Sequence, residues 1–145
     1  MPDLNAMQRL GNRIADALQR GDVVALSGGL GTGKTTLARA IIARLGHCGE
    51  VPSPSFAIIE IYDSPALRLP VAHADFYRLK HVREAEELGL DDYRDNGALI
   101  AEWPEQAGGF AHEPGCLSIT LEIAENGRIA IARPGADWLG REPWM

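Results

Sequence analysis

Residues 28–35 of this chain read Gly28-Gly29-Leu30-Gly31-Thr32-Gly33-Lys34-Thr35, which fits the phosphate-loop pattern G-x-x-x-x-G-K-[ST]. In such a loop, backbone N–H groups curl around phosphate oxygens, and glycines leave the room that this requires. We therefore predict that the whole segment binds a nucleotide. Lys34 is expected to bridge the β- and γ-phosphates, the Thr35 hydroxyl to ligate Mg²⁺, and Thr36 to reach the α-phosphate.

The residues on both sides of the loop have the pattern that a phosphate loop requires. Val23–Leu26 is a short continuous apolar run, typical of a strand buried on both faces. From Lys34 to Leu45 the apolar residues recur at helical spacing, and Gly46 is placed to end that helix. Another helix is predicted between Asp3 and Arg20. This context argues against the alternative interpretation, a glycine-rich turn with a surface lysine.

The middle of the chain predicts more strands of the same sheet. Phe56 to Tyr62 and Leu69 to Phe76 are apolar runs separated by a turn, so we expect two neighbouring strands. Val82 to Leu90 has the composition of a short helix, and Asp91 to Gly97 is interpreted as a polar exit from it. Ala98–Ala101 is another buried-strand run.

The last third predicts an antiparallel hairpin. Apolar and polar residues alternate from Leu117 to Ile123, and Asn126-Gly127 joins this run to Arg128–Ile131 as a tight two-residue turn. With 145 residues, the chain suits one domain, which we place at residues 1–145. The predicted fold is α/β, a phosphate-loop NTPase-like three-layer domain with a mixed, largely parallel central sheet and a C-terminal antiparallel hairpin.

Two acidic residues at the ends of predicted strands are the candidates for the metal side of the site. Glu102 directly follows Ala98–Ala101, and Asp75 closes the run that begins at Leu69. A phosphate loop needs a carboxylate near its metal ion, normally at the end of a hydrophobic strand beside the loop. We expect Glu102 to fill that role and Asp75 to assist. The alternative is that both are ordinary polar residues at strand ends.

Charge and composition exclude several function classes. The chain has 14 Lys+Arg against 20 Asp+Glu, a net charge of −6, so strong direct binding of nucleic acid by this chain alone is not expected. The acidic stretch from Glu84 to Asp95 is interpreted as a solvated helix face, with a surface that docks a partner as the alternative. No apolar stretch has the length of a membrane span, and neither a leader nor a CxxC pair is evident, so we expect a cytoplasmic protein.

Other motifs decide between cofactors. The four histidines show no metal-ligand spacing, so zinc is not predicted. An Asn-Lys-x-Asp motif for reading guanine is missing, which favours ATP over GTP. The expected cofactors are therefore ATP and Mg²⁺.

Several motifs in the same order resemble one family of small phosphate-loop ATPases, the TsaE or YjeE family of tRNA threonylcarbamoyladenosine biosynthesis. The resemblance spans residues 4 to about 133, and its motifs are Gly28 to Thr36, Ser53 to Phe56, His73 to Leu79, Glu87 to Tyr93 and Glu102 to Glu105. Two positions depart from the family pattern. Gly29 stands where an acid is usual, and Ser55 stands where threonine is usual but keeps the hydroxyl group.

The resemblance implies an ATPase that acts with TsaB and TsaD in forming N6-threonylcarbamoyladenosine at position 37 of tRNAs that read ANN codons. In that system TsaD transfers the carbamoyl group, and ATP hydrolysis by the TsaE-like protein supports repeated cycles. By position, Lys34 and Thr35 hold phosphate and Mg²⁺, Glu102 helps hold the metal, and Asp75 supports the metal or the attacking water. Trp103 belongs to a motif near the nucleotide, with a core or rim tryptophan as the alternative.

Two other function classes compete with this interpretation. A small-molecule kinase also uses a phosphate loop, but it usually needs an arginine-bearing lid, which we do not find. In a nucleotide-dependent binding switch, hydrolysis only resets the affinity for a partner. No residue stands out as an arginine finger, so we expect slow hydrolysis that partners accelerate. Pro52 to Phe56 and Val82 to Asp95 are the segments expected to order or dock there.

Overall fold

The computed structural model describes residues 4–29, 31–47, 51, 59–77, 79, 83–84, 90–110, 113–125 and 127–141. Its helices, strands and 3-10 helices are α1 (Leu4–Ala17), β1 (Val23–Ser27), α2 (Lys34–Leu45), β2 (Ile59–Tyr62), β3 (Val71–Asp75), α4 (Leu90–Asn96), β4 (Ala98–Glu102), η1 (Pro104–Ala107), β5 (Cys116–Ala124), β6 (Gly127–Pro134) and η2 (Ala136–Trp138). None of the helices in these ranges is long and apolar enough to cross a membrane.

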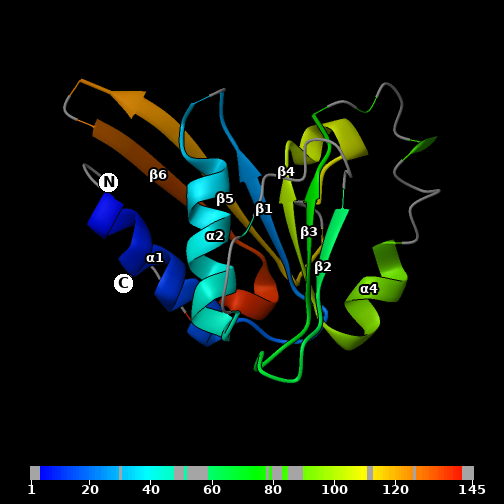
Figure 1. The fold of residues 1–145 in the computed structure, drawn as a ribbon. Helices are drawn as coiled ribbons and strands as arrows, with labels where there is room; N and C mark the ends of the chain where they lie inside the picture. Colours follow the sequence, from blue (N-terminus) through cyan, green and yellow to red (C-terminus); the bar gives the residue numbers. More distant parts are fainter. Residues whose placement is uncertain are drawn as a thin grey trace.

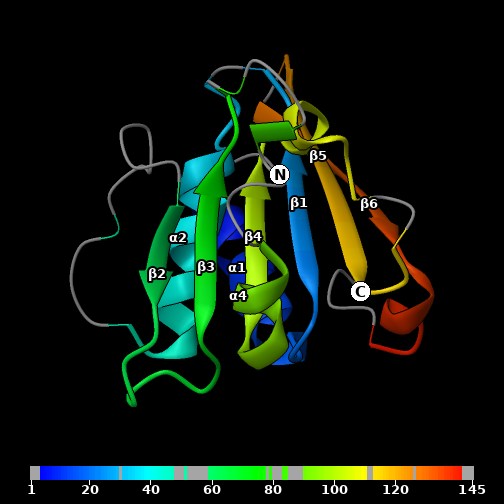
Figure 2. The same ribbon diagram turned by 90° about the vertical axis from the view of Figure 1, so that its right-hand side faces the viewer.

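The strands form one mixed sheet in the order β2-β3-β4-β1-β5-β6 (Figure 2). The central pairs β3/β4, β4/β1 and β1/β5 are parallel, whereas β2/β3 and β5/β6 at the two edges are antiparallel. The predicted largely parallel sheet and the antiparallel C-terminal hairpin are therefore confirmed. Because the front half also contains an antiparallel pair, the parallel part is confined to the middle of the sheet.

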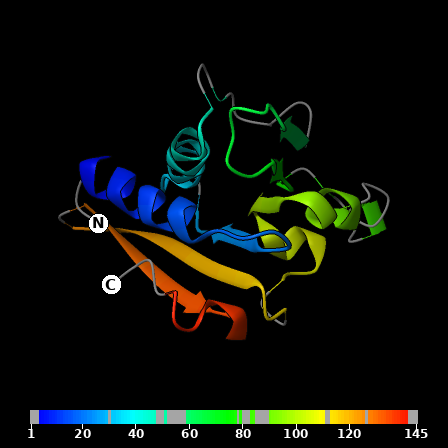
Figure 3. The same ribbon diagram turned by 90° about the horizontal axis from the view of Figure 1, so that it is seen from below.

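The sheet is covered on both faces, which gives three layers (Figures 1 and 3). On one face, α1 and α2 pack on alternate strand residues such as Val24 and Leu26. On the other face, Val23, Ala25 and their neighbours pack with Phe76 and Phe110 in a second apolar cluster, and α4 and η1 also lie against the strands. This alternation explains why each central strand reads as a continuous apolar run.

Glycines decide how α2 is placed against its neighbours. Gly46 ends the helix as predicted, with φ of 123° and its N–H directed at the Ala43 carbonyl. A Cβ atom on Gly11 of α1 would lie 2.5 Å from the Cβ atom of Ala40. The two helices therefore touch where a larger side chain at position 11 does not fit, and this contact fixes α2 and the loop that precedes it.

Two local predictions are wrong in detail. Residues Leu90–Asn96 form α4, although we interpreted Asp91 to Gly97 as a polar exit. This helix has no regular apolar stripe, and it is attached instead by Arg94, which pairs with Glu113 at 2.6 Å and donates to the Gly21 carbonyl. Of the predicted helix before it, residues 82 and 85–89 lie outside the described part of the chain.

The hairpin turn is the second correction. The last pair of the β5/β6 ladder joins Ala124 to Gly127, so Gly127 is the first residue of β6, with φ of 137°. The predicted turn of Asn126-Gly127 therefore does not lie wholly between the strands, because Gly127 already belongs to β6. Glycine still fits there because its φ lies in the region that other residues disfavour.

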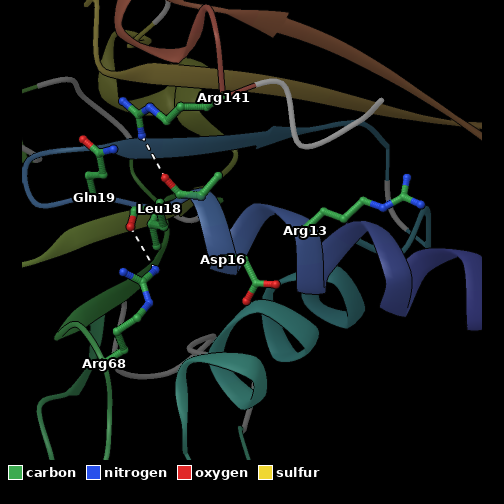
Figure 4. Close-up of a pocket in the computed structure, with 7 residues that line it drawn as sticks. Arg13, Asp16, Leu18, Gln19, Arg68 and Arg141 are labelled. Carbon is green, nitrogen blue, oxygen red and sulfur yellow. Dashed lines mark hydrogen bonds between the residues drawn. The ribbon is translucent and has the colours of Figure 1, made fainter.

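The carboxyl end of α1 is fastened by two arginines, which line an open pocket of about 540 Å³ at the edge of the sheet opposite the glycine loop (Figure 4). Arg68 donates to the carbonyls of Ala15 and Leu18, and Arg141 donates to the Ala17 carbonyl and pairs with Asp22 at 2.6 Å. Cations are favourable at the negative end of a helix dipole. We therefore assign this cluster to stability of the fold.

Candidate functional site

The glycine loop connects β1 to α2 at the carboxyl edge of the parallel strands. Gly28, Gly31 and Gly33 have backbone φ values of 137°, 76° and 103°, which residues other than glycine rarely adopt. A Cβ atom on Gly28 would also overlap the Leu121 carbonyl oxygen. The Thr32 hydroxyl donates to the Gly29 carbonyl at 2.9 Å and braces the loop. Leu30 lies outside the described residues.

Lys34 begins α2 and folds back over the loop. Its Nζ atom donates to the carbonyl oxygens of Gly28 at 2.8 Å and Gly29 at 2.7 Å, and it lies 4.4 Å from the centre of the Trp103 ring. Burial is the main cause that lowers the pKa of the Lys34 ammonium, and the carboxylates of Glu102 and Asp75 oppose that effect. The ammonium group is thus held at the loop, where phosphates would bind.

Thr35, Glu102 and His73 form a chain of hydrogen bonds behind the loop. The Thr35 hydroxyl donates to Glu102, with Oγ1 2.9 Å from Oε1 and 3.2 Å from Oε2. His73 Nε2 lies 2.6 Å from Oε2 of the same carboxylate. Glu102 ends β4 and only 2% of it is exposed, so these two side chains supply the polar contacts that a buried carboxylate needs.

Asp75 lies on the strand next to Glu102. It ends β3, pairs directly with Glu102 in the parallel register, and accepts a hydrogen bond from the N–H of Tyr77 at 3.0 Å. Burial, with the Glu102 charge as a smaller contribution, raises the pKa of the Asp75 carboxyl, while the Tyr77 N–H and the charge of Lys34 act in the opposite direction. The Asp75 and Glu102 carboxylates therefore lie on neighbouring strands at the same edge of the sheet, and Asp75 is the one whose pKa is raised.

Trp103 forms a wall of this site. It has a left-handed backbone conformation with φ of 56°, and its N–H donates to the Leu26 carbonyl at 3.2 Å. The indole ring lies against Lys34 and against Tyr77, whose ring centre is 4.8 Å away. Trp103 is thus a half-buried rim residue in contact with Lys34, and its predicted contact with a nucleotide stays a prediction.

Two residues at this edge were missed by the sequence analysis. His73 was noted among the scattered histidines and as the first residue of a family motif, but no contact with Glu102 was predicted for it, and the strand order places it there. Arg128 of β6 donates to the Gly31 carbonyl at 3.3 Å, so a second positive charge lies beside the loop. Neither residue carries a sequence signal by itself, because both contacts depend on which strands are neighbours. Thr36 lies on the first turn of α2, half-buried, beside the loop.

The oxygen atoms at this edge are of the kind that Mg²⁺ takes as ligands in proteins. Within the described ranges, no group of three or more His, Cys, Asp and Glu side chains is arranged to hold a metal ion. Mg²⁺ usually takes one or two carboxylates together with phosphate oxygens and waters. The Thr35 hydroxyl and the Glu102 and Asp75 carboxylates fit that donor set. Residues 52–56, which we expect to order or dock when partners bind, lie outside the described part of the chain.

Comparisons with known proteins identify the family. The family model described as threonylcarbamoyl adenosine biosynthesis protein TsaE matches residues 1–130. A protein named tRNA threonylcarbamoyladenosine biosynthesis protein TsaE from Streptomyces coelicolor is 43% identical over 100 residues, which cover 68% of each chain. Its namesake from Haemophilus influenzae is 34% identical over 134 residues, which cover 88% of this chain and 83% of that protein.

A solved structure gives the same result at the level of the fold. The crystal structure of Bacillus subtilis YdiB matches with a TM-score of 0.78 and 27% identity, covering 97% of this chain and 87% of that chain. The family match covers most of the chain and includes the glycine loop and both strand-end carboxylates. This chain therefore belongs to the TsaE family.

Proposed function

We propose that this protein binds and hydrolyses ATP with Mg²⁺, and that it acts with TsaB and TsaD in the synthesis of tRNA threonylcarbamoyladenosine. The observation that carries the ATPase part is the convergence of Lys34, Thr35 and Glu102 at one edge of the sheet, 2.9 Å apart in the case of Thr35 Oγ1 and Glu102 Oε1. The names of the relatives and the family resemblance support the part in tRNA modification.

Each side chain has a role that follows from its charge and position. The glycine loop offers backbone N–H groups at the start of α2, where the helix dipole also favours an anion. Lys34 exchanges its carbonyl partners in the loop for phosphate oxygens, which are stronger acceptors because they are charged. Arg128 keeps the loop in place through Gly31 and adds positive charge.

The carboxylates serve the metal and the water. Thr35 and Glu102 would hold Mg²⁺, which when bound neutralises charge on the phosphates. Asp75 is paired with Glu102 on the neighbouring strand, and its raised pKa makes it a better acceptor for a proton from water than an ordinary aspartate. No arginine finger is present in the described part of the chain, and a partner that supplied such a group would be worth roughly 10³-fold or more in rate.

Phosphate release in the presence and absence of partners tests this proposal. We expect slow, Mg²⁺-dependent hydrolysis by the purified protein and faster hydrolysis when the TsaB–TsaD complex is added, with each partner omitted in turn as a control. Rapid hydrolysis by the protein alone, or no response to the complex, contradicts the proposal. Transfer of the phosphate to an added metabolite supports a small-molecule kinase instead.

A further inference from the structure

His73 lies beside the site and has no part in the chemistry proposed above. It is fully buried on β3, where it pairs with Ile100 in the parallel register, and Glu102 is two residues further along β4. Residues two positions apart on neighbouring strands lie on the same face of a sheet. The 2.6 Å contact between Nε2 of His73 and Oε2 of Glu102 is therefore set by the register of two central strands.

The position of the hydrogen atom on His73 follows from its surroundings. The Glu102 carboxylate accepts the Thr35 hydroxyl, so Nε2 of His73 must carry a hydrogen to bond the same group. The other ring nitrogen, Nδ1, is buried and has no hydrogen-bond partner among the residues that the structure describes. A hydrogen there would be an unpaired buried donor, which is costly. The geometry places a hydrogen on Nε2, the nitrogen that faces Glu102.

We propose that His73 is a positioning residue that holds the Glu102 carboxylate in the orientation required for Mg²⁺ and the Thr35 hydroxyl. This inference rests on the proposed function, because it concerns the metal side of the same site. Hydrogen bonds from both Thr35 and His73 restrict rotation of the Glu102 carboxylate about the last bond of its side chain. The Thr35 hydroxyl alone would leave that rotation free. Partners of metal-binding side chains are typically worth 10–100-fold in metal affinity or activity.

The proposal is tested with two substitutions of His73 and one control. His73→Leu removes the donor and keeps an apolar side chain, whereas His73→Gln places an amide N–H near the position of Nε2. Val71→Ala is the matched control, because Val71 is buried on the same strand and face but is not in contact with Glu102. Calorimetry gives the affinity for ADP at a series of Mg²⁺ concentrations. The quantity that is compared is the Mg²⁺ concentration at which half of the full increase in ADP affinity is reached.

We expect His73→Leu to raise this Mg²⁺ concentration about 10–100-fold and to leave ADP affinity without Mg²⁺ within about threefold. His73→Gln is expected to need a Mg²⁺ concentration much closer to that of the wild-type protein than His73→Leu does. Val71→Ala is expected to lower the melting temperature without changing the Mg²⁺ requirement. The inference is overturned if His73→Leu behaves like wild type, or if the Mg²⁺ requirement follows the melting temperature across all three variants.

A second measurement needs neither a variant nor a nucleotide. In ¹H–¹⁵N spectra of the wild-type protein, we expect Nε2 of His73 to carry a hydrogen, and an Nε2 without one contradicts the proposal even if His73→Leu does not fold. The two hypotheses also fail differently. A wild-type protein whose ADP binding ignores Mg²⁺ contradicts the proposed function, whereas the spectrum still reports on the contact between His73 and Glu102.

Discussion

Replacing Lys34 by methionine removes the ammonium group but leaves an unbranched side chain over the Trp103 ring. In the protein without nucleotide, two hydrogen bonds to the carbonyls of Gly28 and Gly29 are lost. The loss is offset because Gly29 is exposed, so water can replace the donor, and because burial of the ammonium is unfavourable, as its lowered pKa indicates. We therefore expect a change in stability of no more than about 1 kcal/mol.

The effect on nucleotide binding is expected to be larger. A hydrogen bond between a charged donor and a phosphate oxygen is typically worth about 1.5–3 kcal/mol, which corresponds to roughly 10- to 100-fold in the dissociation constant. Since Lys34 must first release two carbonyl oxygens, the lower half of that range is the better estimate. Calorimetric titration of ADP in the presence of Mg²⁺ measures this value directly, and thermal unfolding checks the fold.

Arg44→Met is the control for a general loss of positive charge. Arg44 lies in the last turn of the same helix and pairs with Asp16 at 3.0 Å, with both side chains about half exposed. Arg44 and the loop lie at opposite ends of α2, and salt screens the interaction between exposed charges that are so far apart. We therefore expect the ADP affinity of Arg44→Met to stay within about threefold of wild type. Two results contradict the argument: Lys34→Met binds ADP like wild type, or Arg44→Met weakens binding as much.

Three further predictions concern the loop, the edge and the C-terminal segment. Asp75→Asn is expected to raise the melting temperature near neutral pH, because the raised pKa of Asp75 indicates that the folded protein disfavours its charge, and to slow hydrolysis, because it removes the proposed proton acceptor. The gain in stability shrinks as the pH falls through the pKa of Asp75 in the folded protein and is gone below 3.8, the ordinary pKa. Gly28→Ala should cost about 1–2 kcal/mol and most of the ADP affinity, since φ is 137° and a Cβ atom would overlap the Leu121 carbonyl. Gly29→Ala, with open space at that point, should be tolerated in ADP titrations and thermal unfolding. Arg141→Met removes the ion-pair partner of the buried Asp22, which keeps a hydrogen bond from the Gln19 N–H, and is expected to cost about 3 kcal/mol in chemical denaturation without changing ADP affinity.

The sequence predicts those features that depend on local order along the chain. The loop from Gly28 to Thr35 is recognisable because a buried strand precedes it and a helix follows it, and the structure has both at the expected place. Glu102 and Asp75 were chosen because each ends an apolar run, and both do end strands. Local patterns suffice here because one short segment determines each property.

Features that depend on neighbouring strands were not predictable in the same way. His73 is 29 residues from Glu102 in sequence, and the contact exists because β3 lies next to β4 in the sheet. Arg128 is 97 residues from Gly31 and reaches the loop because the β5/β6 hairpin lies beside β1. One sequence gives no strand order, so a histidine or arginine that depends on that order looks like any other.

The difference between the two kinds of residue also explains how the site is built. The residues recognised from the motif, Lys34 and Thr35, come from one segment that carries the ligand-binding groups. Their hydrogen-bond partners come from the strands β4 and β3. Glu102 accepts a hydrogen bond from the Thr35 hydroxyl, and His73 Nε2 contacts the same carboxylate. In the proposed site, the loop alone would set which atoms face a phosphate, whereas the strand order would set how the Glu102 carboxylate is oriented toward the metal. Substitutions on the loop should act first on nucleotide affinity, and substitutions on β3 should act first on the requirement for Mg²⁺.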